Sequence, residues 1–200
     1  MKFLNILSIA AAGLAVCSFL PTVQGAAIEK RDAASDCKVI LDNAKGKITP
    51  LKSQLLEAYG NGDLNNEAYV KNNILPIVVQ ISNVVSIAAK DITLVQLNIN
   101  HKEKRQVDEE AVAHALAALV HEIVEALEPL LHFLGHISIV STLLGTLLAR
   151  LDADLKTIAV GLGLLLGGVL TVVRDLLESL TNALSGLGFL NFLRVIGLLS

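Results

Sequence analysis

The sequence predicts an all-α protein, a helical bundle of about five to six amphipathic helices in two modules that follow a cleaved signal peptide. Three observations predict this fold class. Apolar residues recur at spacings of three and four over most of the chain. The composition is 53% hydrophobic and 18% charged, which is enough apolar material to build cores. Clusters of turn residues and one strongly charged segment separate the apolar stripes.

Residues 1–25 have the pattern of a secretory signal peptide. Lys2 precedes an apolar run that ends at Pro21, and small residues follow. We expect cleavage after Gly25, with cleavage after Ala27 as the second choice. An uncleaved signal anchor is the alternative, and the run is short for a membrane span. The protein is therefore expected to be secreted and extracellular.

Two basic pairs predict proteolytic processing. A short propeptide, residues 26–31, ends in the letters IEKR, and KEKR recurs within a charged linker at 99–110. Both tetrads resemble the sites that kexin-type proprotein convertases of fungi cleave. Such a protease needs an exposed, extended site, and segments too charged to bury apolar surface stay extended and exposed. Ordinary solvated charge is the alternative interpretation. The predicted processing residues are Lys30, Arg31, Lys104 and Arg105.

Residues 32–98 are predicted to form a helical hairpin. The turn residues of 60–66 supply a loop and a helix cap between two stripes. We expect Thr49-Pro50 to kink or restart the first helix and Pro76 to interrupt the second. A strand near 76–85 is the minority interpretation, because β-branched residues are frequent there. The stripes are Cys37, Ile40, Leu41, Ala44, Ile48, Leu51, Leu55 and Tyr59, then Val70, Ile74, Ile77, Ile81, Val84, Ala88, Ile92 and Val95.

Residues 111–200 are predicted to form a leucine- and glycine-rich hydrophobic helical module. Asp108, Glu109 and Glu110 suit the positive end of its first helix. One side of that helix carries His114, His121, Glu125 and Glu128, and the other carries the apolar stripe Val112, Leu116, Leu119, Ile123, Leu127 and Leu130.

The glycine-rich run beyond residue 158 is predicted to continue as one amphipathic helix, because its apolar stripe extends into charged sequence. A membrane-spanning hairpin is the alternative. Residues 130–149 would reach about 30 Å as a helix, whereas 158–173 would reach only about 24 Å. The stripe supplies the predicted surface or membrane contacts, Leu162, Leu166, Val169, Val173, Leu176 and Leu180.

Charge and cysteine content exclude several classes of protein. Residues 32–105 carry a net charge of +1 and residues 106–200 a net charge of −6, so we expect no nucleic-acid partner. Only Cys37 remains after signal cleavage, which excludes a disulfide framework and the hydrophobins. Cys37 is either a buried helix-face residue or an intermolecular bridge.

No enzymatic motif is complete. The letters HEIVE at 121–125 resemble a zinc-protease motif, but Glu125 stands where the second histidine would be. His132 and His136 are four residues apart, with Pro129 and Gly135 disturbing the helix and no third ligand apparent. We therefore expect no enzyme activity, no cofactor and no metal.

Twenty-six leucines in the last 95 residues exceed what a small helical core needs. Burying one leucine contributes roughly 1.5 to 3 kcal/mol. Transfer of a few leucines from water to a hydrophobic surface would therefore bind the module firmly to that surface. The hypothesis is a bundle whose leucine-rich module opens or self-associates at hydrophobic surfaces.

Together, the cleaved leader, the IEKR site, the scarcity of cysteine and the Ala-, Val- and Leu-rich stripes resemble small secreted hydrophobic cell-surface and cell-wall proteins of filamentous fungi, the non-hydrophobin, adhesion type. The resemblance implies a structural or adhesive role in the cell wall or extracellular matrix. Its implied partners are a hydrophobic surface, cell wall or lipid interface, a kexin-type protease and further copies of the chain. The rival hypothesis is a kexin-processed precursor of secreted effector or membrane-active helical polypeptides.

Overall fold

The computed structural model describes residues 33–64, 66–98, 109–132 and 138–199, and these residues form one compact unit. The prediction of an all-α bundle is confirmed, since the described residues contain helices and no strand. In chain order the elements are α1 (Ala33–Asn61), α2 (Glu67–Tyr69), the π-helix η1 (Val70–Ile74), α3 (Leu75–Asn98), α4 (Glu109–Leu127), the 3₁₀-helix η2 (Glu128–His132), α5 (Ser138–Leu165), α6 (Val169–Leu177), the 3₁₀-helix η3 (Glu178–Leu180), α7 (Thr181–Gly186) and α8 (Leu190–Val195).

The first hairpin forms as the sequence predicts, with two differences. The Asn66 side chain caps α2 by accepting hydrogen bonds from two backbone N–H groups, which confirms the predicted cap. Pro50 lies inside α1 and does not restart it, so that part of the prediction is wrong. Pro76 lies inside the continuous helical run Glu67–Asn98, and the π-turn η1 immediately before it is the irregularity that accommodates its missing N–H.

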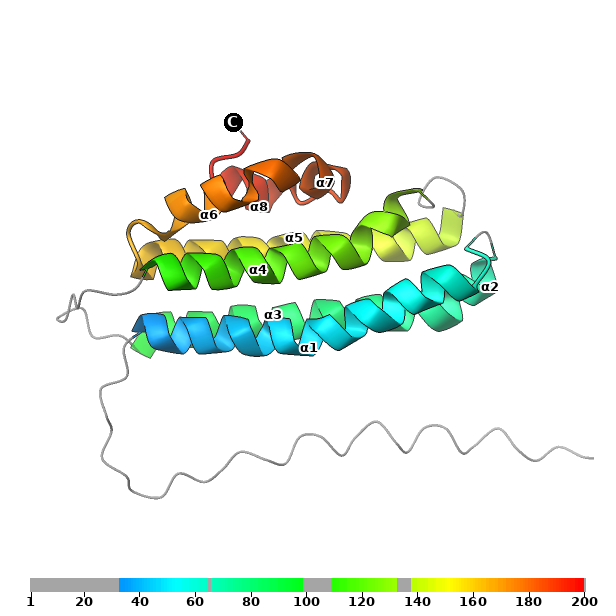
Figure 1. The fold of residues 1–200 in the computed structure, drawn as a ribbon, viewed down its shortest axis with the longest axis horizontal. Helices are drawn as coiled ribbons and strands as arrows, with labels where there is room; N and C mark the ends of the chain where they lie inside the picture. Colours follow the sequence, from blue (N-terminus) through cyan, green and yellow to red (C-terminus); the bar gives the residue numbers. More distant parts are fainter. Residues whose placement is uncertain (1–32, 65, 99–108, 133–137, 200) are drawn as a thin grey trace, which may run out of the picture. The chain divides into compact units, whose positions relative to one another are not determined.

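Four long helices form the core of the unit in two layers. α1 packs against α3 and α4, and α3 packs against α5. Figure 1 shows α1 and α3 in one layer and α4 and α5 in the next, with α1 and α4 in front. The two predicted modules thus pack on each other, because each hairpin alone would leave one apolar side of its helices in water.

Close approach of α3 and α5 depends on a glycine. A Cβ atom at Gly161 would lie 2.9 Å from a methyl carbon of Ile92, so a larger residue would require Ile92 or the helix backbone to shift. About two helical turns earlier along both helices, the hydroxyl of Ser86 on α3 donates a hydrogen bond to Asp154 on α5. These contacts show that α3 and α5 run side by side in the same direction.

Beyond α5, the chain folds back in short helices between Val169 and Val195. The prediction of one continuous amphipathic helix is wrong, because α5 ends at Leu165 and α6 begins at Val169. After this turn α6 packs on α4, and α8 packs on α5, so they form a third layer (Figure 1). A straight helix would have left its apolar stripe without a partner, whereas the turn buries it. Gly188, at φ +82°, ends α7 in the left-handed conformation that glycine permits, and buried Phe189 follows.

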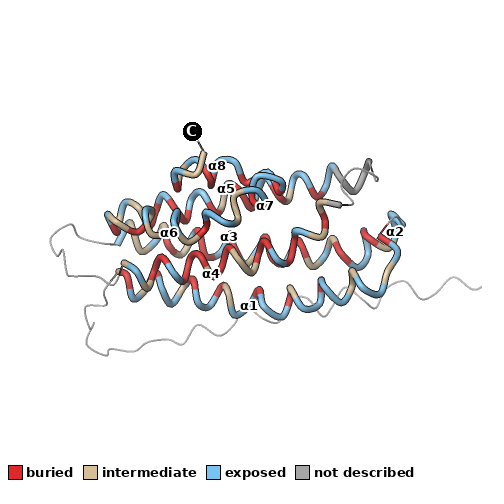
Figure 2. Tube along the Cα trace, turned by 45° about the horizontal axis from the view of Figure 1, so that its top comes forward, coloured by how far each residue is buried: buried red, intermediate tan, exposed pale blue. Residues whose placement is uncertain are grey.

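The apolar stripes predicted for α1, α3 and α4 point inward, as the buried residues in Figure 2 show. Cys37 is buried on α1, which confirms the first of its two predicted environments. Among the described residues, the stretch Glu67–Asn98 is long and apolar enough to span a membrane by length and composition. A core helix has the same composition, and this one packs on α1 and α5.

Candidate surface-binding face

The six predicted contact residues do not form an exposed stripe in the folded chain. Leu162 in α5, Leu166 directly after it, and Val169 and Val173 in α6 are buried in the core. Leu176 and Leu180 are partly buried and pack against it. The prediction of a surface stripe is therefore wrong for the first four residues, because α6 folds back and α4 and α5 cover them. The four processing residues lie outside the described residues, as does His136.

Exposed large apolar side chains gather on a different part of the molecule. Of the nine such residues in the described part of the chain, three lie elsewhere: Val39, Leu56 and Leu190. The other six lie on two neighbouring helices, and we call them the α3/α5 face. They are Ile87, Leu94 and Leu97 on α3, and Leu143, Val160 and Leu164 on α5.

Helical spacing explains why these side chains face outward. Ile87, Leu94 and Leu97 follow one another at seven and three residues, so they share a side of α3 that is turned away from the buried stripe. Val160 and Leu164, four residues apart, do the same on α5. Leu97 and Leu164 are 75% and 68% exposed, which leaves most of their apolar surface in water.

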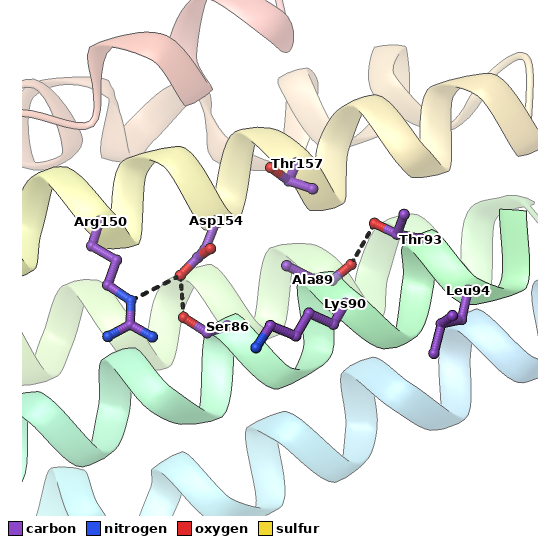
Figure 3. A pocket seen from close by; sticks show the side chains of 8 residues that line it. All are labelled: Ser86, Ala89, Lys90, Thr93, Leu94, Arg150, Asp154 and Thr157. Atoms are coloured by element: carbon purple, nitrogen blue, oxygen red, sulfur yellow. Dashed lines mark hydrogen bonds and ion pairs between the residues drawn. The ribbon is translucent and has the colours of Figure 1, made fainter. Parts of the chain in front are cut away.

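An open groove of about 510 Å³ lies between α3 and α5, and Leu94 is the member of the α3/α5 face that lines it. Figure 3 shows polar and charged groups at one end, where Arg150, Asp154, Ser86 and the ammonium of Lys90 gather. Asp154 accepts a hydrogen bond from Ser86 and lies 3.9 Å from Nε of Arg150. The rest of the lining is Ala89, Thr93, Leu94 and Thr157.

The opposite side of the four-helix core is polar and ionic. Nζ of Lys52 on α1 donates a hydrogen bond to Oε2 of Glu125 at 2.7 Å. Oε2 of Glu122 lies 2.8 Å from the same nitrogen, at ion-pair distance but outside hydrogen-bond geometry. The HEIVE sequence therefore supplies partners for a lysine. Among the described residues, no three His, Cys, Asp or Glu side chains are grouped to hold a metal ion.

These contacts shift the pKa values of both partners. The contact with Glu122, followed by the hydrogen bond to Glu125, raises the pKa of Lys52. The hydrogen bond from Lys52 lowers the pKa of Glu125. On the same interface the phenol of Tyr59 donates to the carbonyl oxygen of Ala126 at 3.0 Å, and burial raises the pKa of that phenol.

We expect Lys52→Gln to lower the free energy of unfolding at pH 7 by roughly 1 kcal/mol, because these pairs are only partly covered. Since the pKa of Glu125 is lowered, the contribution of this carboxylate to stability is present above the ordinary carboxylate pKa. It is lost as pH falls through the lowered pKa. Since the pKa of Lys52 is raised, its contribution is present below the ordinary lysine pKa and is lost as pH rises through the raised value.

Urea unfolding of both proteins from pH 7 to pH 3 measures this effect. The difference in free energy of unfolding between wild type and Lys52→Gln should become smaller toward pH 3. Lys38→Gln, which removes an exposed pair with Asp42 on α1, is the control and should change stability by less than about 0.5 kcal/mol. A pH-independent difference would contradict the ion-pair explanation.

Two carboxylates attach the third layer to the core. Oε2 of Glu109, in the first turn of α4, accepts a hydrogen bond from the backbone N–H of Gly168 at 3.0 Å. Asp152 on α5 is buried, and it accepts hydrogen bonds from the backbone N–H groups of Asn191 and Phe192 at the start of α8. These contacts hold α6 and α8 over the leucines of α4 and α5.

Sequence reasoning missed the α3/α5 face because it assigned each helix a single apolar side. The sequence does contain a weak indication of this face. Residues 84–97 carry apolar side chains on more than the buried side of α3, and Val160 and Leu164 lie off the stripe predicted for α5. A search of family models and a search of curated proteins both returned no match for this chain.

Proposed function

We propose that this chain is a secreted structural or adhesive protein that adsorbs to hydrophobic surfaces of a cell wall or extracellular matrix through the α3/α5 face. The observation that supports the proposal most directly is that six of the exposed large apolar side chains lie on two adjacent helices. Single exposed apolar residues are normal on soluble proteins, whereas several on neighbouring helices indicate a contact surface.

The energy of adsorption is sufficient without unfolding. The six side chains are between 40% and 75% exposed, so covering them removes about half of their surface from water. At roughly 1.5 to 3 kcal/mol for complete burial, each contributes about 1 kcal/mol. Together they stabilise an adsorbed state by several kcal/mol, and the bundle does not have to open.

The rival proposal of two independent polypeptides has less support from the packing. The residues before and after the charged linker cover each other through the α1 and α4 contact and the α3 and α5 contact. Fragments released by cleavage after Arg105 would have to break both interfaces before acting alone.

Adsorption to octadecyl-coated silica beads tests the proposed face. The double variant Leu97→Gln/Leu164→Gln should bind about tenfold more weakly than wild type, because it removes roughly 1 to 2 kcal/mol of apolar contact. The matched control, Val39→Gln/Leu56→Gln, changes two exposed apolar residues of α1 and should bind like wild type. Equal loss in both variants, or no loss in either, would contradict this assignment.

A further inference from the structure

We infer that the hydrophobic surface recognised by the α3/α5 face is a lipid surface that carries negative charge. The inference rests on the proposed function and adds the chemistry of the partner. It is based on the charged side chains among and beside the apolar residues of the face.

Three cations border the exposed apolar side chains. Lys90 lies three residues after Ile87 and four before Leu94, so it sits within the apolar stripe of α3. Its side chain is exposed, and its ammonium points toward the Arg150 end of the groove (Figure 3). Arg150 lines the same groove. Lys156 is exposed on α5, four residues before Val160.

The acidic groups of these two helices compensate the cations only in part. Asp152 is buried and occupied by the start of α8. Asp154 accepts a hydrogen bond from Ser86 and forms an ion pair with Arg150 at 3.9 Å. Asp91, half-buried, is the remaining acid of α3. Lys90, Arg150 and Lys156 against Asp91 and Asp154 leave this face with a net charge of +1, although the whole chain has a net charge of −3.

This arrangement fits an anionic lipid surface better than an uncharged wax. At an uncharged oil surface the three cations would gain nothing and would lose hydration as the leucines approached. At an anionic bilayer, leucine side chains enter the boundary of the acyl chains while lysine and arginine extend their charged ends to the headgroups. Each such cation strengthens binding by roughly fivefold, and the attraction acts over about 8 Å at physiological salt.

The acidic side chains of α4 lie across the core from this face. Glu122 and Glu125 are engaged by Lys52 on the α1 and α4 side, whereas α3 and α5 form the other side (Figure 1). Screening by salt over a distance of one or two helix diameters reduces their repulsion from a lipid surface. Binding should therefore follow the local charge of the α3/α5 face.

Vesicle co-sedimentation of the purified chain tests the inference. Vesicles of phosphatidylcholine alone are compared with vesicles that contain about one third phosphatidylglycerol. Wild type should bind the anionic vesicles at least tenfold more tightly, and added salt should reduce that advantage. The triple variant Lys90→Gln/Arg150→Gln/Lys156→Gln should bind both vesicles equally.

The control variant Lys45→Gln/Lys47→Gln/Arg194→Gln makes the same change in net charge on α1 and α8, and it should keep the preference. Equal binding of wild type to both vesicles, or an unchanged preference in the triple variant, would overturn the inference. Adsorption to the uncharged octadecyl beads separates this outcome from failure of the proposed function. If the triple variant still adsorbs to beads while anionic selectivity is absent in wild type, only the lipid inference is lost.

Discussion

Replacing Asp152 with alanine is expected to lower the free energy of unfolding by about 3 kcal/mol and to loosen the third helical layer. The side chain is only 3% exposed. Its carboxylate accepts hydrogen bonds from the backbone N–H of Asn191 at 3.2 Å, from the Asn191 amide at 2.7 Å and from the backbone N–H of Phe192 at 2.9 Å. Hydrogen bonds to a charged acceptor are stronger than neutral ones, and their loss leaves the backbone N–H of buried Phe192 without a partner.

Guanidinium unfolding gives the change in stability, and amide hydrogen exchange locates it. Exchange should accelerate first in α8, because the carboxylate holds the first turn of that helix against α5. Asp175→Ala is the control. Asp175 is exposed on α6 and its ion pair is with the adjacent Arg174, so its loss should cost less than about 0.5 kcal/mol. Similar effects of the two substitutions would show that Asp152 does not anchor the layer.

Two leucines separated by one residue should behave in opposite ways when each is changed to alanine. Leu162 is fully buried in the core, so Leu162→Ala should cost between about 2 and 5 kcal/mol, depending on how far the site collapses. Leu164 is 68% exposed on the α3/α5 face, so Leu164→Ala should change stability by less than about 0.5 kcal/mol. Thermal or denaturant unfolding of the two variants measures the difference.

Adsorption of the same two variants to octadecyl beads should show the reverse order. Leu164→Ala removes apolar contact with the surface, whereas Leu162→Ala leaves the α3/α5 face intact as long as the protein remains folded. If Leu162→Ala instead weakened adsorption more than Leu164→Ala at a temperature where both are folded, the buried stripe would be the contact. Adsorption would then proceed by opening of the bundle.

These experiments connect the stability of the protein with its proposed role. A face that is already exposed allows adsorption and release without crossing an unfolding barrier. The hydrogen bonds from the start of α8 to Asp152, and from Gly168 to Glu109, hold the third layer in place. They keep the buried leucines of α4 and α5 covered in solution. The chain can therefore carry much apolar material without exposing most of it.

The helical periodicity alone was sufficient to predict the helices of the hairpin and of α4. The predicted stripe of α4, from Val112 to Leu130, is buried throughout, and the histidines and acids predicted opposite it are partly or fully exposed. Such predictions succeed because spacings of three and four residues depend only on helix geometry. The cap at Asn66 was predictable for the same local reason.

The tertiary structure decided which apolar sides face water. Leu162 and Leu164 lie in one uniform apolar run, and their different exposure follows from where α4, α6 and α3 approach α5. The turn between Leu165 and Val169, and the pairing of Lys52 with Glu125, likewise join residues through packing of distant segments. A sequence pattern states which residues share a side of a helix, but the neighbouring helix determines whether that side is core or surface.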